Sequence, residues 1–461
     1  MKIIQILYNF LWGDLFAIPL PGGSSIGISL LVLLLIPTGI YFTLRTKFLP
    51  IRLFPEMLRI SVEKNVGGHK GALSGMQALI VSTATRVGMG NMVGVVAAVS
   101  AGGAGAVFWM WITALIGSST AFIEATLAQL HKQADPLYGG YRGGPAQYIH
   151  NFFAKGKRYS VIAILFALSG LLCWCGVSQV ISNSVSSAFE NAFNIPPIVS
   201  TVILVTLAAI IVLRKNATVK VLDVIVPIMA AFYFVIAIVV IIKNFGLLPE
   251  VFTRIFEEAF GLRQMAAGGF GAALMNGVKR GLFSNEAGSG SAPCAAAAAD
   301  VSHPAKAGLF QAFGVIIDTI VICSCTAFIM LLAPSNLLEG LSGMELLQTA
   351  MFHHFGQAGV IFTAIALWLF SFSTFIGILF YARSNVAYLF GDNWKSQTIY
   401  KVVALVMLFI GGLAAYTFVW DLGDIGIGLM TIFNMIAIWP MAGQAINSLK
   451  EYTELKKQKR L

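Results

Sequence analysis

Charged residues are scarce in this chain. Only 11% of its 461 residues are Asp, Glu, Lys or Arg, whereas 57% are hydrophobic and the mean hydropathy is +0.82. A soluble domain carries about 25% charged residues, so this composition excludes an ordinary soluble protein. The polar gaps between the apolar runs from Ile26 to Leu449 are short, which indicates one helical bundle in a lipid bilayer. We therefore expect an all-α polytopic fold in which residues 1–461 form a single domain.

Several motifs of soluble chemistry are also missing from the sequence. The formal charge is +10, but no dense basic block occurs, so a nucleic-acid partner is not expected. All five cysteines fall in apolar segments, which argues against an external disulfide framework and against a soft-metal site. No GxxxxGK[ST] sequence is present, and the histidines form no metal or nucleophile pattern. These absences exclude a built-in ATP motor of that class and disfavour an enzyme.

Apolar runs long enough to cross a bilayer recur along the chain. A spanning helix needs about 20 mainly apolar residues. Eleven runs meet this measure, near 26–44, 76–100, 105–130, 159–189, 197–213, 220–242, 266–298, 307–333, 358–390, 398–419 and 425–447. We interpret the first run as an extra N-terminal helix and the residues before it as an amphipathic lead-in.

Basic residues alternate with these runs in a way that predicts the orientation. Six of them lie in the gap between the first two runs, from Arg45 to Lys70, and the tail at residues 448–461 is basic as well. The positive-inside rule places both segments in the cytoplasm, and the N-terminus outside. The expected location is the cell inner (plasma) membrane. Two amphipathic stretches on the outer side, at residues 247–263 and 334–357, are candidate lids.

Two of the runs are interrupted by residues that weaken a membrane helix. The second contains STATRVGMGN at 82–91, and the seventh contains GLFSNEAGSGSAP at 281–293. Glycines can serve close helix packing, and that interpretation stays open. It does not account for the neighbouring Asn, Ser and Glu residues, because irregular polar backbone in a membrane is tolerated where it lines a cavity or binds a ligand.

The interruptions occupy corresponding positions if residues 76–242 and 266–447 are two five-helix repeats. The predicted topology makes these repeats inverted, since the second span starts inside and the seventh starts outside. Paired interrupted helices in corresponding positions are typical of the binding site of a secondary carrier. A channel does not need them, and no filter sequence is apparent.

The chemistry at the interruptions suits an amino-acid zwitterion. Backbone amides of Gly88, Met89 and Gly90 are candidates for the substrate carboxylate, because glycine lets the backbone approach closely. Carbonyls and side chains around Phe283, Ser284 and Asn285 are candidates for binding the ammonium group at the opposite end.

A sodium site is expected beside the first interruption. The ninth run contains FSFSTFIG at 370–377, which includes the adjacent hydroxyls of Ser373 and Thr374. Two interpretations of these hydroxyls are open. They bond to their own helix, or they complete an oxygen cage with carbonyls near Ala84 and Val87. The Asn91 amide oxygen is a further neutral ligand that suits sodium.

These segments carry a family resemblance. The sequences TRVGMGN, GGAGAVFWMWITALIGSSTAFIEATLAQ and GLFSNEAGSGSAPCAAAAA resemble signature regions of the sodium:alanine symporter family, also called the alanine or glycine:cation symporters. The similarity extends from NFLWG, near Phe10, to the last run. The resemblance implies a five-plus-five inverted repeat of the leucine-transporter type after one extra helix. It also implies sodium-coupled symport of alanine, glycine or a related neutral amino acid such as glutamine.

The resemblance assigns roles to individual residues. It implies carboxylate binding for Gly88, Met89 and Gly90, a sodium contact for Asn91, and the paired sodium hydroxyls for Ser373 and Thr374. Gln179 is expected to face the substrate, with an interhelical hydrogen bond as the equal alternative. The chain departs from the family after the Ser-Thr pair, where it has GILFYAR with Ile378 and Arg383. We expect Ile378 to reshape the pocket floor and to admit a side chain other than that of alanine.

Charged residues inside the runs are functional candidates. Arg86 is expected to pair with Glu286 or Glu124, and a clamp on the substrate carboxylate is its other interpretation. Glu124, Glu286 and Asp318 are candidate proton carriers, so a proton-coupled amino-acid carrier of the same fold is the alternative function.

Overall fold

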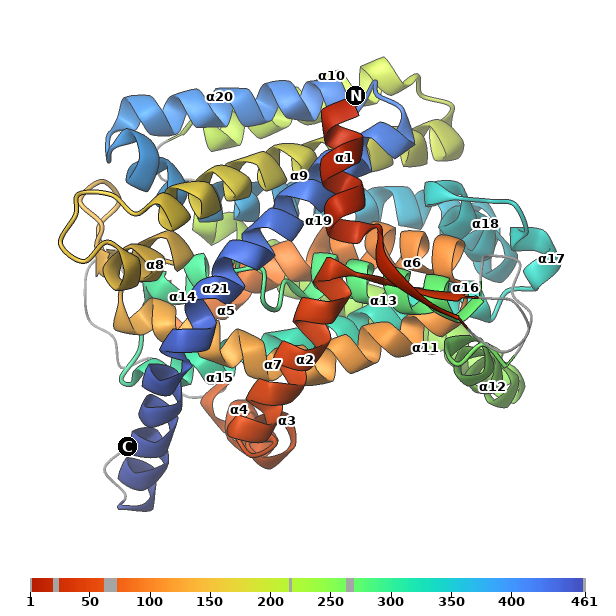
Figure 1. The fold of residues 1–461 in the computed structure, drawn as a ribbon. Coiled ribbons are helices and arrows are strands. Elements are labelled where there is room, and N and C mark those ends of the chain that lie inside the picture. The colour runs from red at the N-terminus through yellow and green to blue at the C-terminus, as the bar shows by residue number, and fades with distance from the viewer. Residues whose placement is uncertain (1, 20–24, 62–72, 215–217, 263–268, 459–461) are drawn as a thin grey trace.

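The computed structural model describes residues 2–19, 25–61, 73–214, 218–262 and 269–458, most of which are helical (Figure 1). Within these ranges, six helical stretches are long and apolar enough to cross a membrane, and a bent pair joining residues 228–243 to 245–259 raises that number to seven. Each of the eleven predicted runs contains a helix. The predicted all-α polytopic class is confirmed, and the chain is a multi-pass membrane protein.

The N-terminal segment is more elaborate than one extra helix. It comprises α1 (Lys2–Trp12), β1 (Asp14–Pro19), β2 (Ser25–Ser29), α2 (Leu30–Arg45), α3 (Leu49–Arg52) and α4 (Phe54–Ser61). Strands β1 and β2 form an antiparallel hairpin that the sequence did not predict. The helix predicted from residue 26 begins at Leu30, because the Ser29 hydroxyl accepts a hydrogen bond from the Val32 amide at 3.2 Å and caps it.

The first predicted repeat begins after β3 (Leu73–Ser74). Its elements are α5 (Gly75–Thr85), η1 (Arg86–Gly94), α6 (Val95–Gly102), α7 (Gly105–Leu130), β4 (Gln133–Ala134), β5 (Tyr141–Arg142), α8 (Pro145–Phe153), α9 (Val161–Phe193), α10 (Pro197–Val212) and α11 (Thr218–Lys243). The segment η1 is a π-helix, so the first interrupted span stays helical with a wider turn in its middle.

The second predicted repeat follows η2 (Phe245–Leu247) and α12 (Leu248–Ala259). Its elements are α13 (Gly269–Asn285), α14 (Pro293–Ala298), β6 (Ala299–Asp300), α15 (Pro304–Ile316), η3 (Ile317–Cys323), α16 (Ser324–Leu331), α17 (Ser335–Leu338), α18 (Gly343–Phe355), α19 (Gln357–Phe390), α20 (Trp394–Gly411) and α21 (Tyr416–Lys457). The seventh span is truly broken between α13 and α14. A second π-helix, η3, interrupts the eighth span, which the sequence did not predict.

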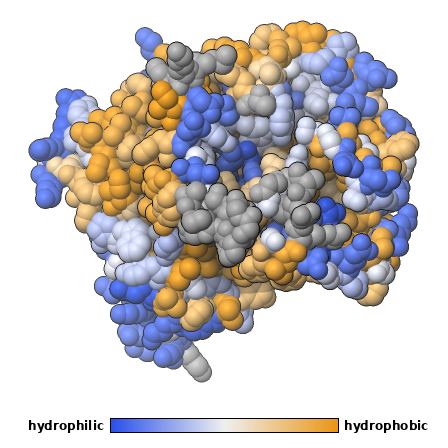
Figure 2. All heavy atoms as spheres, turned by 45° about the vertical axis from the view of Figure 1, so that its right-hand side comes forward, coloured by the Kyte–Doolittle hydropathy of each residue, from blue (hydrophilic) through white to orange (hydrophobic). Residues whose placement is uncertain are grey.

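The helices pack closely through small residues, as is common in membranes. A Cβ on Gly176 of α9 would lie 2.3 Å from the Gly423 nitrogen of α21. One on Gly411 of α20 would lie 2.2 Å from the Gln179 Cα. Apolar side chains also reach the surface in broad patches, while hydrophilic ones gather at the left and right edges of the view in Figure 2. A soluble monomer rarely exposes such patches, whereas a lipid-facing surface requires them.

The two ends of the bundle are distinct (Figure 1). One end holds α8 and the C-terminal part of α21, at the left, and we call it the tail side. The other holds α12, α17 and α18, at the right, and we call it the lid side. The two candidate lid stretches predicted from sequence contain these three helices. Strand β3, directly before α5, pairs in parallel register with β6, directly after α14, which links the start of the first interrupted span to the end of the second.

Candidate substrate and ion site

The π-helix η1 diverts backbone amides from the helical pattern towards side chains. The Gly88 amide donates to Asn91 Oδ1 at 2.9 Å, and the Met89 amide donates to Thr374 Oγ1 at 3.2 Å. A wide turn cannot satisfy every amide by the regular i→i−4 bond, so these side chains take that place. The first predicted interruption thus takes the form of a π-helical turn within a continuous helical span, with two amides directed at side-chain oxygens.

The second interruption is a change of backbone direction. Helix α13 ends at Asn285, and Glu286 follows with a φ of 59°, in the left-handed region that a non-glycine residue seldom adopts. The Ser289 hydroxyl donates to the Glu286 carbonyl at 2.7 Å, which satisfies a carbonyl released by the helix end. The backbone from 286 to 292 then reaches α14 without forming a helix.

The two interrupted spans touch each other where glycine leaves room. A Cβ on Gly90 would lie 3.1 Å from the Ser284 Cα, and one on Gly88 would lie 2.0 Å from Thr374 Oγ1. Glycine at these positions lets η1 lie directly against α13 on one side and α19 on the other. The three segments that carried the sequence predictions therefore meet.

A small cavity lies at this junction. Its volume is about 30 Å³, room for about two water molecules. The lining residues come from η1, α9, α13, the 286–292 segment, α19 and α21, and all are buried: Met89, Gly90, Cys173, Trp174, Val177, Phe283, Glu286, Ser289, Ser291, Thr374, Ile378, Ile427 and Met430. Its lining, apolar walls with a few polar groups, has the composition of a small-molecule site.

Aromatic and charged groups close the cavity on the lid side. Phe283 lies 4.9 Å from the Trp420 ring, between ring centroids. The Arg280 guanidinium lies 3.8 Å from the centroid of the same ring and donates to both carboxylate oxygens of Asp424, at 2.9 and 3.1 Å. Lys279 also pairs with Asp424, at 3.0 Å. This stack joins α13 to α21 between the cavity and the lid side.

Hydrogen bonds to Glu286 close the cavity towards the tail side. Ser291 Oγ donates to Glu286 Oε2 at 2.9 Å, and the Tyr381 hydroxyl donates to the same oxygen at 3.3 Å. The carboxylate thus links the broken span to α19. A buried carboxylate needs such donors, because an unpaired charge in a membrane interior is costly.

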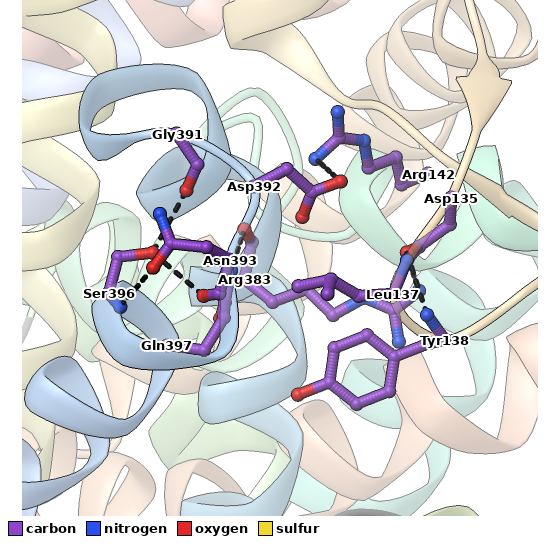
Figure 3. Close-up of polar contacts among 10 residues, drawn as sticks. All are labelled: Asp135, Leu137, Tyr138, Arg142, Arg383, Gly391, Asp392, Asn393, Ser396 and Gln397. Carbon is purple, nitrogen blue, oxygen red and sulfur yellow. Dashed lines mark hydrogen bonds and ion pairs between the residues drawn. The ribbon is translucent and has the colours of Figure 1, made fainter.

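Two ion pairs close the bundle further towards the tail side (Figure 3). Arg383, at the end of α19, pairs with Asp135, and Arg142 Nη1 lies 3.0 Å from Asp392 Oδ2. Burial raises the pKa of Asp392, although Arg142 acts in the opposite direction. Together the pairs tie the β4–β5 hairpin to the junction of α19 and α20. Arg383 therefore serves this contact and does not line the cavity.

Five of the predicted site residues line the cavity together. They are Met89, Gly90, Phe283, Thr374 and Ile378. Gly88 lies beside them, against Thr374. The Ser373 hydroxyl donates to the Phe370 carbonyl at 2.8 Å, which is the bond within its own helix that the sequence left open as an alternative.

The remaining predicted residues lie elsewhere. Ser284 and Asn91 are buried behind the cavity lining, and Asn285 lines a second small cavity between α2, α7 and α13. Gln179 Nε2 contacts Met407 Sδ of α20 at 3.5 Å, in keeping with its interhelical interpretation. Ala84 and Val87 lie at the junction of α5 and η1, and their side chains fall outside the described part of the structure. The assignments of these residues stay predictions.

The expected ion pair of Arg86 is wrong. Within the described residues, Arg86 makes no ion pair with Glu286 or Glu124; its Nη1 donates to the Gln311 carbonyl at 3.3 Å. Gly314 makes room for it, since a Cβ there would lie 2.7 Å from that nitrogen. Both glutamates have other donors, because Glu286 accepts from Ser291 and Glu124 accepts from the Gly288 amide.

Asp318 was expected only as a candidate proton carrier, and its contacts with the two interrupted spans were not predicted. It is fully buried in η3 and accepts from Asn91 Nδ2 at 2.8 Å, Ser284 Oγ at 3.0 Å and Thr319 Oγ1 at 2.9 Å. It therefore joins both interrupted spans through side chains. A lone carboxylate in an apolar run was the available signal. Trp174 was missed as a lining residue because an aromatic in a spanning helix gives no sign of which way it faces.

Comparisons with known proteins identify the family and the fold. The chain is 43% identical over 429 residues to the "Probable sodium/glutamine symporter GlnT" of Bacillus subtilis, covering 93% of this chain and 88% of the relative. It is 35% identical over 408 residues to the "Sodium/proton-dependent alanine carrier protein" of Bacillus sp. strain PS3, covering 84% and 90%. The crystal structure of MhsT in complex with L-phenylalanine matches with a TM-score of 0.58 at 14% identity, covering 80% of this chain and 89% of that one, which shows a shared fold.

The model of the sodium:alanine symporter family matches residues 23–461, nearly the whole chain. Together with the relatives, which are named as carriers, this match places the protein among transporters. The chain belongs to the sodium:alanine symporter family.

Proposed function

We propose that the protein couples inward movement of sodium to symport of a small neutral amino acid, with alanine or glycine preferred and glutamine as the next candidate. The observation that carries the proposal is the cavity between η1 and α13, lined by buried residues, with Thr374 on its wall. Thr374 Oγ1 holds the Met89 amide on the face of η1 that also carries Gly88. Substrate and ion would then bind to the same turn of backbone, which is the simplest structural basis for coupling.

The two ends of an amino acid suit different parts of the cavity. The substrate carboxylate would accept hydrogen bonds from amides of η1 near Met89 and Gly90, and would replace the side-chain oxygens that accept them here. The ammonium would lie near the C-terminal end of α13, where helix carbonyls favour a cation, and near the Glu286 carboxylate. Sodium, as a hard cation, suits the neutral oxygens of Ser373, Thr374 and Asn91, together with carbonyls near Ala84 and Val87.

The two closures support a mechanism of alternating access. Separation of the stack formed by Arg280, Trp420 and Asp424 would open a path to the lid side. Release of the hydrogen bonds to Glu286, together with the ion pairs of Arg383 and Arg142, would open a path to the tail side. We assign the tail side to the cytoplasm on the positive-inside rule, and the membrane to the cell inner membrane. The inverted repeats would be residues 76–242 and 266–447, with residues 26–44 outside them.

A proton-coupled carrier is the second candidate, favoured by the Glu286 carboxylate in the cavity wall and by the sodium/proton-dependent relative. Uptake of labelled alanine, glycine and glutamine into proteoliposomes distinguishes the two. A sodium gradient at equal pH on both sides is expected to drive uptake, and a pH gradient without sodium is not. Uptake that follows the pH gradient and ignores sodium would select the proton carrier.

Ile378 is proposed to set the size of the accepted side chain, because it lines the cavity at a position where the chain departs from its family. Unlabelled amino acids added in competition should then include an effective competitor larger than alanine. Competition by alanine and glycine alone would remove this proposal.

A further inference from the structure

A second, larger cavity lies on the tail side, away from the central site. Its volume is about 310 Å³, and it lies between the β4–β5 hairpin, α8, the loop before α9 and the last turns of α19. The lining residues are mostly polar and include Arg142, His150, Arg158 and Tyr388. Two guanidinium groups and an imidazole thus line it, and none of these described lining residues is acidic.

The charges around the cavity are not balanced. The two nearby carboxylates are engaged, since Asp392 pairs with Arg142 at 3.0 Å and Asp135 pairs with Arg383. Arg158 makes no ion pair with any residue that the structure describes, and its guanidinium lies 5.2 Å from the Tyr159 ring centroid. Lys155 and Lys157 are exposed on the same loop. The mouth of the cavity therefore carries an excess of positive charge.

Hydroxyl and imidazole groups are held in place on the opposite wall. His150 Nδ1 lies 2.9 Å from the Tyr388 hydroxyl oxygen, and the Ser160 amide donates to that oxygen at 3.3 Å. The His150 and Tyr388 rings meet edge to face, with centroids 5.6 Å apart. These bonds fix two polar side chains from α8 and α19 beside the guanidinium groups.

The cavity borders the lipid-facing surface. Four apolar side chains on one face of α9 are strongly exposed, beginning one residue after the Ser160 cap: Val161 (71%), Leu165 (40%), Leu168 (47%) and Leu172 (37%). Their spacing of three or four residues is that of a helix stripe. A molecule with its polar head in the cavity can lay its chains along this stripe.

We propose that this cavity binds a phosphate group, supplied by the head of an anionic membrane lipid. Basic pockets between helices at the cytoplasmic surface are suited to anionic lipid heads, and Arg forms paired hydrogen bonds with phosphate. The adjoining stripe favours a lipid over free phosphate, because only a lipid uses both surfaces. This inference does not depend on which solute the central cavity carries.

Native mass spectrometry of the purified full chain tests the proposal with phosphatidylglycerol and phosphatidylcholine of the same acyl chains. The wild type is expected to retain phosphatidylglycerol preferentially. Arg158→Gln should weaken that retention about fivefold, the factor expected from about 1 kcal/mol per basic residue at an anionic surface. Arg158→Lys should keep most of it. Arg214→Gln, an equal loss of charge at an exposed tail-side position, should have no effect.

Inorganic phosphate distinguishes the two sources of the group. In one outcome, phosphate raises the unfolding temperature of the wild type but not of Arg158→Gln, and no lipid is retained preferentially. This outcome supports the site, with a free anion as its occupant. Equal phosphatidylglycerol retention by Arg158→Gln and Arg214→Gln, with no phosphate effect, overturns the proposal. Because Arg158 is exposed and makes no described ion pair, its replacement should leave folding intact, which the unfolding temperature checks directly.

Discussion

Gly88 shows how one missing side chain positions the whole site. The Thr374 hydroxyl occupies the space that a Cβ at Gly88 would take, and from there it accepts the Met89 amide. The glycine therefore serves close approach between two helices. Gly94, in the same π-helix, is different, since a Cβ there would lie 3.7 Å from the Phe283 ring, an ordinary contact distance.

This difference gives a matched pair of variants. Gly88→Ala is expected to displace Thr374 and to reduce sodium-driven uptake by about 5- to 150-fold, because such overpacking costs about 1–3 kcal/mol. Gly94→Ala should retain most of the uptake. Both are measured in proteoliposomes at equal protein content. Equal uptake by the two variants would mean that the contact between η1 and α19 does not matter for transport.

The site residues differ in how far sequence could place them. Five predicted residues line one cavity. Met89, Gly90 and Phe283 were predicted because irregular polar backbone in a membrane lines a cavity or binds a ligand. Thr374 and Ile378 lie on the continuous helix α19 and were predicted from the hydroxyl pair and the family resemblance. Asn285 was assigned with its neighbours, yet it lines another cavity. Its direction depends on where α13 ends, and a boundary one residue earlier or later would turn it by about 100°.

At the scale of helices, the two π-helices differ in whether the sequence predicts an irregular turn. Glycines marked η1, but η3 has the sequence IDTIVIC, which contains no glycine or proline. Its wide turn coincides with Asp318 accepting bonds from two other spans. Tertiary contacts of this kind leave no periodic signal, so η3 was expected to be plain helix. The division into two five-helix repeats stays a prediction at this scale.

The end of α19 offers a test of how the tail side is closed. Arg383→Gln leaves the Asp135 carboxylate buried without its partner, which should cost about 3–5 kcal/mol. Adding Asp135→Asn removes the uncompensated charge, so the double variant should be more stable than Arg383→Gln alone. Thermal unfolding in detergent measures both.

The control follows from the geometry. Because Arg383 lies away from the cavity, neither variant should change the order in which amino acids compete for uptake. Additive losses of stability in the double variant would show that the two residues are not coupled.

At the scale of the molecule, the last helix reaches well beyond the bundle. Helix α21 has 42 residues, a length of about 63 Å at 1.5 Å per residue, which exceeds the thickness of a bilayer. Its final turns pack against α4, where Glu56 accepts hydrogen bonds from Arg59 and Tyr452 and pairs with Lys456. Sequence predicted a basic tail but not that it continues the helix, because the partner residue lies some 400 positions earlier.

The Glu56 contacts predict how docking of this tail depends on pH. Burial acts to raise the pKa of Glu56, but hydrogen bonds from Arg59, Lys456 and Tyr452 outweigh it and lower that pKa from 4.5 to about 2. A group with a depressed folded-state pKa stabilises the folded form above its unfolded pKa. Docking should therefore be constant from neutral pH to about 5 and weaken as the pH falls from 4.5 towards 2.

A dye on Gln458→Cys reports this contact, since the five native cysteines are all buried. Its fluorescence anisotropy should fall across that acidic range. Glu56→Gln should lower it already at neutral pH, whereas Glu454→Gln, at an exposed position, should not. An anisotropy that is unchanged by Glu56→Gln would contradict the docked tail.

The central claim is that sodium and the amino acid bind to the same turn of η1 and so strengthen each other's binding. Alanine affinity of the purified protein, measured at increasing sodium with potassium as the balancing ion, tests it most directly. We predict that saturating sodium tightens alanine binding by about 5- to 150-fold, a coupling of about 1–3 kcal/mol. This gain should be lost in Ser373→Ala, Thr374→Ala. Alanine affinity that does not change with sodium in the wild type would contradict the account.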